Sequence, residues 1–196
     1  PHHSTALLNR GLILEMQQRP EEALAQFEAA LKENNGLALA HHHLAGLLRR
    51  KGDREQALRH YRQARGFDPG NQSTAVNLGF TLVEVGRLAE AKELFLQAQE
   101  QAPDDAEAYI GQGDVLLAEN NLNEAEAAYR HALRLSPDNA VALKQYGFLL
   151  VRQGKSAEAL EKFEAARAAL PYDAGLYCGL GDVSFARGEL ERAESY

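Results

Sequence analysis

The sequence predicts an all-α protein, a solenoid of stacked helix-turn-helix units. In the stretch 72–105, apolar and small residues fall on two separate helical faces, one before Gly86 and one between Gly86 and Pro103, as a pair of packed helices requires. The same pattern returns every 34 residues in both directions, and self-similarity at a fixed period is the signature of a repeat architecture. The hydrophobic content of 45% and the charged content of 25% are ordinary for a folded globular chain.

The repeat divides the chain of 196 residues into consecutive units. Residues 1–3 precede the first unit and are interpreted as a tag or tail remnant. Because the last unit stops within its second helix, we expect the natural chain to continue past Tyr196 as a longer protein. The predicted units are 4–37, 38–71, 72–105, 106–139 and 140–173, followed by an incomplete unit at 174–196.

A small residue and a large ring alternate between the two predicted helices of each unit. Position 8, in the middle of the first helix, is glycine or alanine, although glycine costs about 1 kcal/mol of helix propensity. Close approach of the second helix explains this choice, and we predict that the ring at position 24 fills the space that small residues leave. The small residues are Gly11, Ala45, Gly79, Gly113, Gly147 and Gly181, and the rings are Phe27, Tyr61, Phe95, Tyr129 and Phe163.

Turn residues mark where the predicted helices begin and end. Between the two helices, a glycine favours a left-handed C-terminal cap; Asn120 takes this place in the fourth unit, and Gln18 is the exception in the first. Prolines end the second helices, because proline lacks an amide hydrogen and disfavours helix in the preceding residue. The cap glycines are Gly52, Gly86, Gly154 and Gly188, the prolines are Pro69, Pro103, Pro137 and Pro171, and the predicted N-caps are Asn71, Asp105, Asn139 and Asp173.

This combination of small, aromatic, glycine and proline positions resembles the tetratricopeptide repeat (TPR) family over nearly the whole chain. The resemblance implies helix pairs stacked in a right-handed superhelix, with the first helices lining a concave groove. It also implies a scaffold that holds peptides or other proteins. No GxSxG, GxxxxGK[ST] or HExxH motif is present, so we expect no catalysis and no cofactor. The alternatives are the repeat arm of a larger enzyme or secretion or assembly machine that recruits its substrate, and an RNA-binding helical array.

The resemblance places a peptide-binding groove on one face of the first helices. Positions 2, 5, 9 and 12 share this face, which is largely apolar in this sequence. Such surface is expected where an extended apolar peptide or an amphipathic helix binds, although part of it could instead pack against neighbouring repeats. Polar groups there would orient the ligand backbone. The predicted groove residues are Asn9, Leu12, His42, His43, Val76, Asn77, Phe80, Ile110, Asp114, Lys144, Gln145, Phe148 and Val151.

Several other partners fit the sequence less well. Chaperone-binding relatives hold a C-terminal carboxylate with a set of lysine, asparagine and arginine side chains that no three successive units supply here; Lys144, for example, is followed at position 9 by Phe148. The net charge of −7 disfavours nucleic acid, and no apolar run approaches the roughly 20 residues that cross a bilayer. The second unit has seven basic and three acidic residues, interpreted as a solvated face, with a docking patch for an acidic partner or RNA as the alternative.

The histidines and the cysteine give no metal site in this interpretation. His41, His42 and His43 point to different sides of one helix, and His41 is expected to pack between repeats. The lone Cys178 excludes an intramolecular disulfide and a multi-cysteine zinc site. The compartment stays open, with the cytoplasm favoured over the periplasm. Self-association is a further expectation, because an uncapped stack end at the C-terminus could pair with a second copy.

Overall fold

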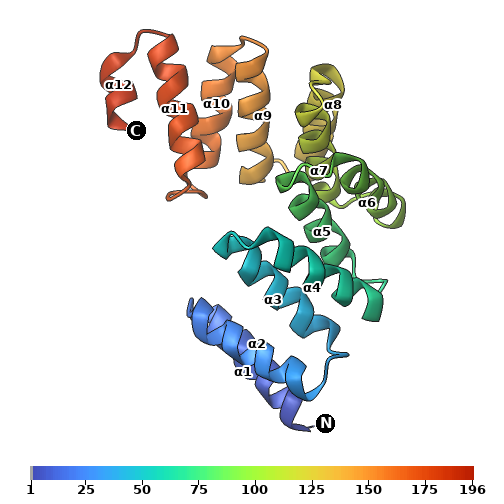
Figure 1. The fold of residues 1–196 in the computed structure, drawn as a ribbon. Coiled ribbons are helices and arrows are strands. Elements are labelled where there is room, and N and C mark those ends of the chain that lie inside the picture. Colours follow the sequence, from blue (N-terminus) through green and yellow to red (C-terminus); the bar gives the residue numbers. More distant parts are fainter. Residues whose placement is uncertain (1) are drawn as a thin grey trace. The chain divides into compact units, whose positions relative to one another are not determined.

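Helices and connecting turns make up the part of the chain that the computed structural model describes, residues 2–196, with side chains described from residue 3 (Figure 1). Pro1, part of the predicted tag remnant, lies outside the described residues. Over residues 2–196 there are twelve helices and no strand, which confirms the all-α prediction. The helices are α1 (His2–Met16), α2 (Pro20–Glu33), α3 (Ala38–Lys51), α4 (Arg54–Phe67), α5 (Gln72–Glu84), α6 (Leu88–Gln101), α7 (Ala106–Ala118), α8 (Leu122–Leu135), α9 (Ala140–Arg152), α10 (Ser156–Arg167), α11 (Ala174–Ala186) and α12 (Leu190–Ser195).

The chain folds as two compact units, each of which contains several of the 34-residue repeats. The first unit ends at Leu94 and the second unit runs from Phe95 to Tyr196, so the division falls inside α6. In the first unit α1 packs on α2 and α3 on α4, and the two pairs meet through α2 and α3. In the second unit α7 packs on α8 and α9 on α10, and these pairs meet through α8 and α9. Each unit is therefore a stack of helical hairpins, as the repeat predicts.

Left-handed residues close the turns within the helix pairs, as predicted. At the end of α3, the Gly52 amide donates to the Arg49 carbonyl at 3.0 Å and the Asp53 amide donates to the Leu48 carbonyl at 2.9 Å. These two bonds are the Schellman motif, which satisfies the last carbonyls of a helix. The residues with positive φ among those described are Gly52 (93°), Gly86 (77°), Gly154 (75°), Gly188 (76°), Asn120 (65°) and Gln18 (58°).

Gln18 makes the same turn without being glycine, and replacing it should stabilise the first hairpin. Its amide donates to Glu15 and the Arg19 amide donates to Leu14, each at 3.0 Å. A left-handed conformation costs an L-residue about 1–2 kcal/mol, and glycine avoids this cost. Glycine also loses more backbone entropy on folding, which offsets part of the gain. We expect Gln18→Gly to add about 0.5–1 kcal/mol, measured by urea denaturation followed by circular dichroism. Gln17→Gly, one residue earlier, should not stabilise the protein; a gain from Gln17→Gly alone would contradict this explanation.

A buried ring faces a glycine within the helix pairs. Phe27, Tyr129 and Phe163 have no exposed surface. A Cβ atom added to Gly11 would lie 2.5 Å from the ring of Phe27, and one added to Gly147 would lie 2.4 Å from the ring of Phe163. These distances are well inside van der Waals contact, so the close approach of the two helices requires the absence of a side chain. The predicted pairing of small residues with rings is confirmed at these positions.

Candidate functional site

The two histidines predicted to line a groove in the first unit make contacts between its first helices. His43 Nδ1 lies 2.8 Å from Glu15 Oε2, and Arg50 donates to Glu15 Oε1 at 2.5 Å, which links α3 to α1. His42 Nδ1 lies 2.8 Å from the Thr74 hydroxyl, which links α3 to α5. Both predicted groove histidines therefore contribute to the packing of adjacent repeats.

The other predicted groove residues of the first unit differ in exposure. Asn9 is exposed, and Leu12 and Phe80 are half-buried. Val76 is only 5% exposed, so the prediction that it contributes to an open apolar trough is wrong; its side chain belongs to the core. The Asn77 amide donates to a carbonyl of its own helix at 2.9 Å, so it is already engaged there.

Asp114 is the centre of a polar cluster in the second unit. The Tyr129 hydroxyl donates to Asp114 Oδ1 at 2.6 Å, and the Gln145 amide donates to the same oxygen at 2.8 Å. Burial raises the pKa of Asp114 to about 6, although both hydrogen bonds and the charge of Lys144 lower it. Asp114 is therefore ionised at neutral pH and takes up a proton in mildly acidic solution.

Two helix caps hold the charged side chains around this cluster. Lys144 donates to Asp173 Oδ2 at 2.6 Å, while Asp173 Oδ1 caps α11 by accepting from the Leu176 amide at 2.8 Å. Burial alone would raise the pKa of Asp173, but these bonds hold it below its usual value. Asn139, the cap of α9, donates to Glu107 Oε1 at 3.0 Å. Contrary to the prediction, Lys144 is not free to orient a ligand, because its ammonium group is held by a carboxylate.

Apolar side chains on the first helices of the second unit range from buried to exposed. Ile110 has no exposed surface, so the prediction that it lines an open groove is wrong. Phe148 is half-buried and meets Phe163 edge to face, with ring centroids 5.0 Å apart. Val151 is 38% exposed and Phe185 is 69% exposed. The apolar surface available to a partner therefore lies on α9 and α11.

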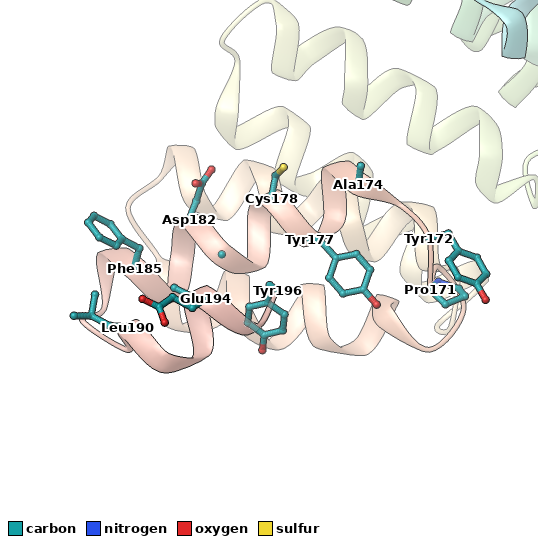
Figure 2. A pocket seen from close by; sticks show the side chains of 12 residues that line it. Pro171, Tyr172, Ala174, Tyr177, Cys178, Asp182, Phe185, Leu190, Glu194 and Tyr196 are labelled. Carbon is teal, nitrogen blue, oxygen red and sulfur yellow. The ribbon is translucent and has the colours of Figure 1, made fainter.

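A hollow of about 900 Å³ opens beside α11 and α12 (Figure 2). Phe185 and Leu190 lie at one end of it and Tyr172 lies at the other, with Asp182 on an edge of α11. Within 4 Å, a Cβ atom added to Gly181 would meet only a backbone carbonyl oxygen, at 3.7 Å, whereas at the equivalent Gly11, Gly113 and Gly147 it would meet a ring. The expected self-association would use this hollow, and it stays a prediction.

Ion pairs engage several arginines of the second repeat. Arg49 and Arg54 contact Glu84 at 3.5 and 2.9 Å, and Arg62 contacts Glu90 at 3.0 Å. Exposed pairs of this kind contribute about 0–1 kcal/mol each, but they neutralise part of the basic patch. This agrees with the interpretation of the patch as a solvated face.

His41 is buried, as predicted, and its partner is a histidine that the sequence analysis missed. The two Nδ1 atoms of His41 and His60 are 2.9 Å apart. No sequence signal could have found this contact, because no other repeat has histidines at these two positions. Within the described residues, no three His, Cys, Asp or Glu side chains are grouped so that they could hold a metal ion. The same residues include no helix that combines the length and apolar character needed to span a membrane.

Matches to known protein families identify the type of repeat. One tetratricopeptide repeat model matches residues 76–140 and 148–196, and three others match residues 4–37, 40–73 and 128–161. The chain belongs to the tetratricopeptide repeat family. TPR proteins are generally protein-interaction scaffolds without catalysis of their own. A comparison of this TPR chain with curated protein sequences returned no match.

Solved TPR structures share the fold of this chain. A thermophilic TPR protein of Thermus thermophilus is 24% identical, with a TM-score of 0.78 over 93% of this chain and 99% of that one. PilW, described as a type IV pilus biogenesis factor, is 21% identical, with a TM-score of 0.80 over 98% and 90%. YrrB, described as a TPR protein with an unusual peptide-binding site, is 23% identical, with a TM-score of 0.61 over 87% and 88%. At these identities the likeness establishes the fold alone.

Proposed function

We propose that this TPR chain is a scaffold that captures a basic, amphipathic segment of a partner protein on the first-helix face of its second unit, formed by α7, α9 and α11. One observation carries the proposal. Exposed apolar side chains on this face, Val151 and Phe185, lie in register with two carboxylates. Asp182 is exposed, and Asp114 is half-buried with its Oδ1 hydrogen-bonded; within the described residues, neither carboxylate forms an ion pair with a cation.

The repeat register supports two parallel rows across the three helices. Asp114, Phe148 and Asp182 are spaced by 34 residues and stand at position 9 of their helices, and α9 contacts both α7 and α11. The first row therefore places an aromatic side chain on the helix between two carboxylate-bearing helices. The second row, at position 12, is apolar and consists of Leu117, Val151 and Phe185.

The chemistry of the first row favours a cationic side chain. An ammonium or guanidinium group gains from charge-assisted hydrogen bonds to carboxylates and from the face of an aromatic ring. Lys144 does not supply this charge, because its ammonium group is held by Asp173. The apolar row would accept a leucine, valine or phenylalanine of the same segment, and the net charge of −7 would attract a basic partner over a distance.

Two alternatives from the sequence bear on this face. A repeat arm that brings a substrate to a larger enzyme or secretion machine would bind that substrate through the same surface. This alternative therefore differs from the proposed scaffold only in the role of the bound partner. An RNA ligand is disfavoured, because carboxylates on this face repel phosphates. The occupied Lys144 also supports the exclusion of chaperone C-terminal carboxylates.

The test is a selection from a random peptide display library on the whole chain, followed by affinity measurement by calorimetry. We expect enriched peptides to carry arginine or lysine beside apolar residues. Their binding should weaken as the pH falls through about 6, where Asp114 becomes protonated. Asp182→Asn should weaken binding about two- to fivefold, the size of a surface ion pair.

Asp138→Asn is the matched control, because it removes the same charge from an exposed position in the loop before α9. It should leave the affinity of the selected peptides unchanged. Enrichment of acidic peptides, or equal loss of affinity in Asp182→Asn and Asp138→Asn, would contradict binding of a basic segment on this face.

A further inference from the structure

His41 and His60 form a hydrogen-bonded pair where the first repeat meets the second. His41 is on α3 and His60 is on α4, and their Nδ1 atoms are 2.9 Å apart. The ring centroids are 5.1 Å apart with an interplanar angle of 28°, so the two nitrogens point toward each other between nearly coplanar rings. The other nitrogen of His41, Nε2, lies 3.0 Å from the carbonyl oxygen of Asn35 in the loop between α2 and α3.

The carbonyl group fixes where the protons are. A carbonyl oxygen only accepts, so His41 Nε2 carries a hydrogen and donates it to Asn35. Neutral His41 then has a bare Nδ1, and the hydrogen between the rings belongs to His60. The pair therefore links α4 to α3, and α3 to the loop that leads from the first repeat.

The same arrangement limits how many protons the pair can bind. A first extra proton can enter at His60 Nε2 and leave the hydrogen bond between the rings intact. A second would have to bind His41 Nδ1, which would set two N–H groups against each other at 2.9 Å. While the rings stay together, the pair holds at most one positive charge.

The surroundings oppose even the first charge. His41 is 1% exposed, and burial lowers the pKa of both His41 and His60. Arg59 of α4 lowers the pKa of His60 further. From α2, Glu28 and Lys32 line a hollow together with His60, so one anion and one cation face the pair there. The ring of Phe67 stacks on His41 at 5.9 Å between centroids and shields it from water.

We propose that the His41–His60 pair is a one-proton latch that makes the seating of the first repeat on the second sensitive to mildly acidic pH. When the latch opens, each histidine can take a proton near pH 6.5. The open form then binds more protons than the closed form, so acidification favours opening. The closed form is fully favoured above about pH 6.5 and loses this advantage as the pH falls below it.

Hydrogen exchange of the whole chain, corrected for intrinsic rates, measures the opening of α2 and α3 between pH 7.5 and 5. For each additional proton bound by the open form, the opening constant should rise about tenfold per pH unit below 6.5. His60→Gln keeps a donor for His41 but cannot titrate. Because burial keeps the closed wild-type pair uncharged over most of this range, opening of the variant takes up one proton fewer, and the slope should fall by about a factor of ten per pH unit. His131→Gln, on α8 of the second unit, should keep the wild-type slope for α2 and α3.

NMR titration of the wild-type histidine rings tests the latch even if His60→Gln does not fold. We expect His41 and His60 together to take up no more than one proton while the amides of α2 and α3 stay protected. Full and independent protonation of both rings near pH 6.5 with those amides still protected would overturn the proposal. An unchanged slope in His60→Gln would overturn it as well.

Discussion

Replacing Phe163 with alanine should destabilise the second unit by about 3–5 kcal/mol, the usual loss for a buried phenylalanine. The ring has no exposed surface, and its atoms lie within 2.4 Å of where a Cβ atom of Gly147 would be and within 2.9 Å of that of Gly179. The ring therefore fills the space between two consecutive hairpins. After the substitution this space stays empty, because the neighbouring glycines have no side chains that could move into it. Urea denaturation followed by circular dichroism measures the loss.

Phe185→Ala is the matched control for this substitution in the same unit. Its ring is 69% exposed, so the same change of side chain should alter stability by no more than about 0.5 kcal/mol. Equal losses in Phe163→Ala and Phe185→Ala would contradict the packing described for the second unit.

Adding one methyl group at Gly147 should have the second-largest effect. The new Cβ atom would lie 2.4, 2.6 and 2.9 Å from three atoms of the Phe163 ring, and that ring is enclosed on all sides. The helices must move apart to relieve this overlap, at a cost of about 1–3 kcal/mol. The loss should appear as a lower denaturation midpoint with an unchanged helical spectrum.

Gly66→Ala provides the opposite case. A Cβ atom there meets no other atom within 4 Å, and the residue lies inside α4. The better helix propensity of alanine should therefore stabilise the protein, by up to about 1 kcal/mol. A Gly147→Ala protein as stable as Gly66→Ala would show that close helix approach does not require glycine at position 8.

The repeated parts of the fold could be predicted because each copy of the pattern supports the others. The pairing of a glycine with a ring, as at Gly147 and Phe163, and the left-handed turn, as at Gly52, occur in several repeats at the same spacing. This recurrence excludes a chance match in a single repeat. The same reasoning misled at Ile110. Its neighbour Gly111 lets the ring of Phe95 come within 2.1 Å of where a Cβ atom would be, and packing this close accompanies the complete burial of Ile110.

Polar partners could not be predicted, because they occur in single repeats. Lys144 and Asp173 are 29 residues apart and pair once, and His41 meets His60 once. A position on a helical face is set by periodicity, but the partner of a long polar side chain depends on which neighbour offers a complementary group. Among the residues predicted to line the groove, Val76 and Ile110 are buried and Lys144 is held by a carboxylate, so periodicity alone did not identify which side chains are free.

The most direct test of the proposed scaffold is where a selected peptide touches the chain. A photo-crosslinking amino acid at Val151, on α9, is compared with one at the exposed Glu161, on α10. We expect the peptide to cross-link from position 151 and not from position 161. Cross-linking from position 161 alone would place the partner on the second helices and would contradict binding to the face formed by α7, α9 and α11.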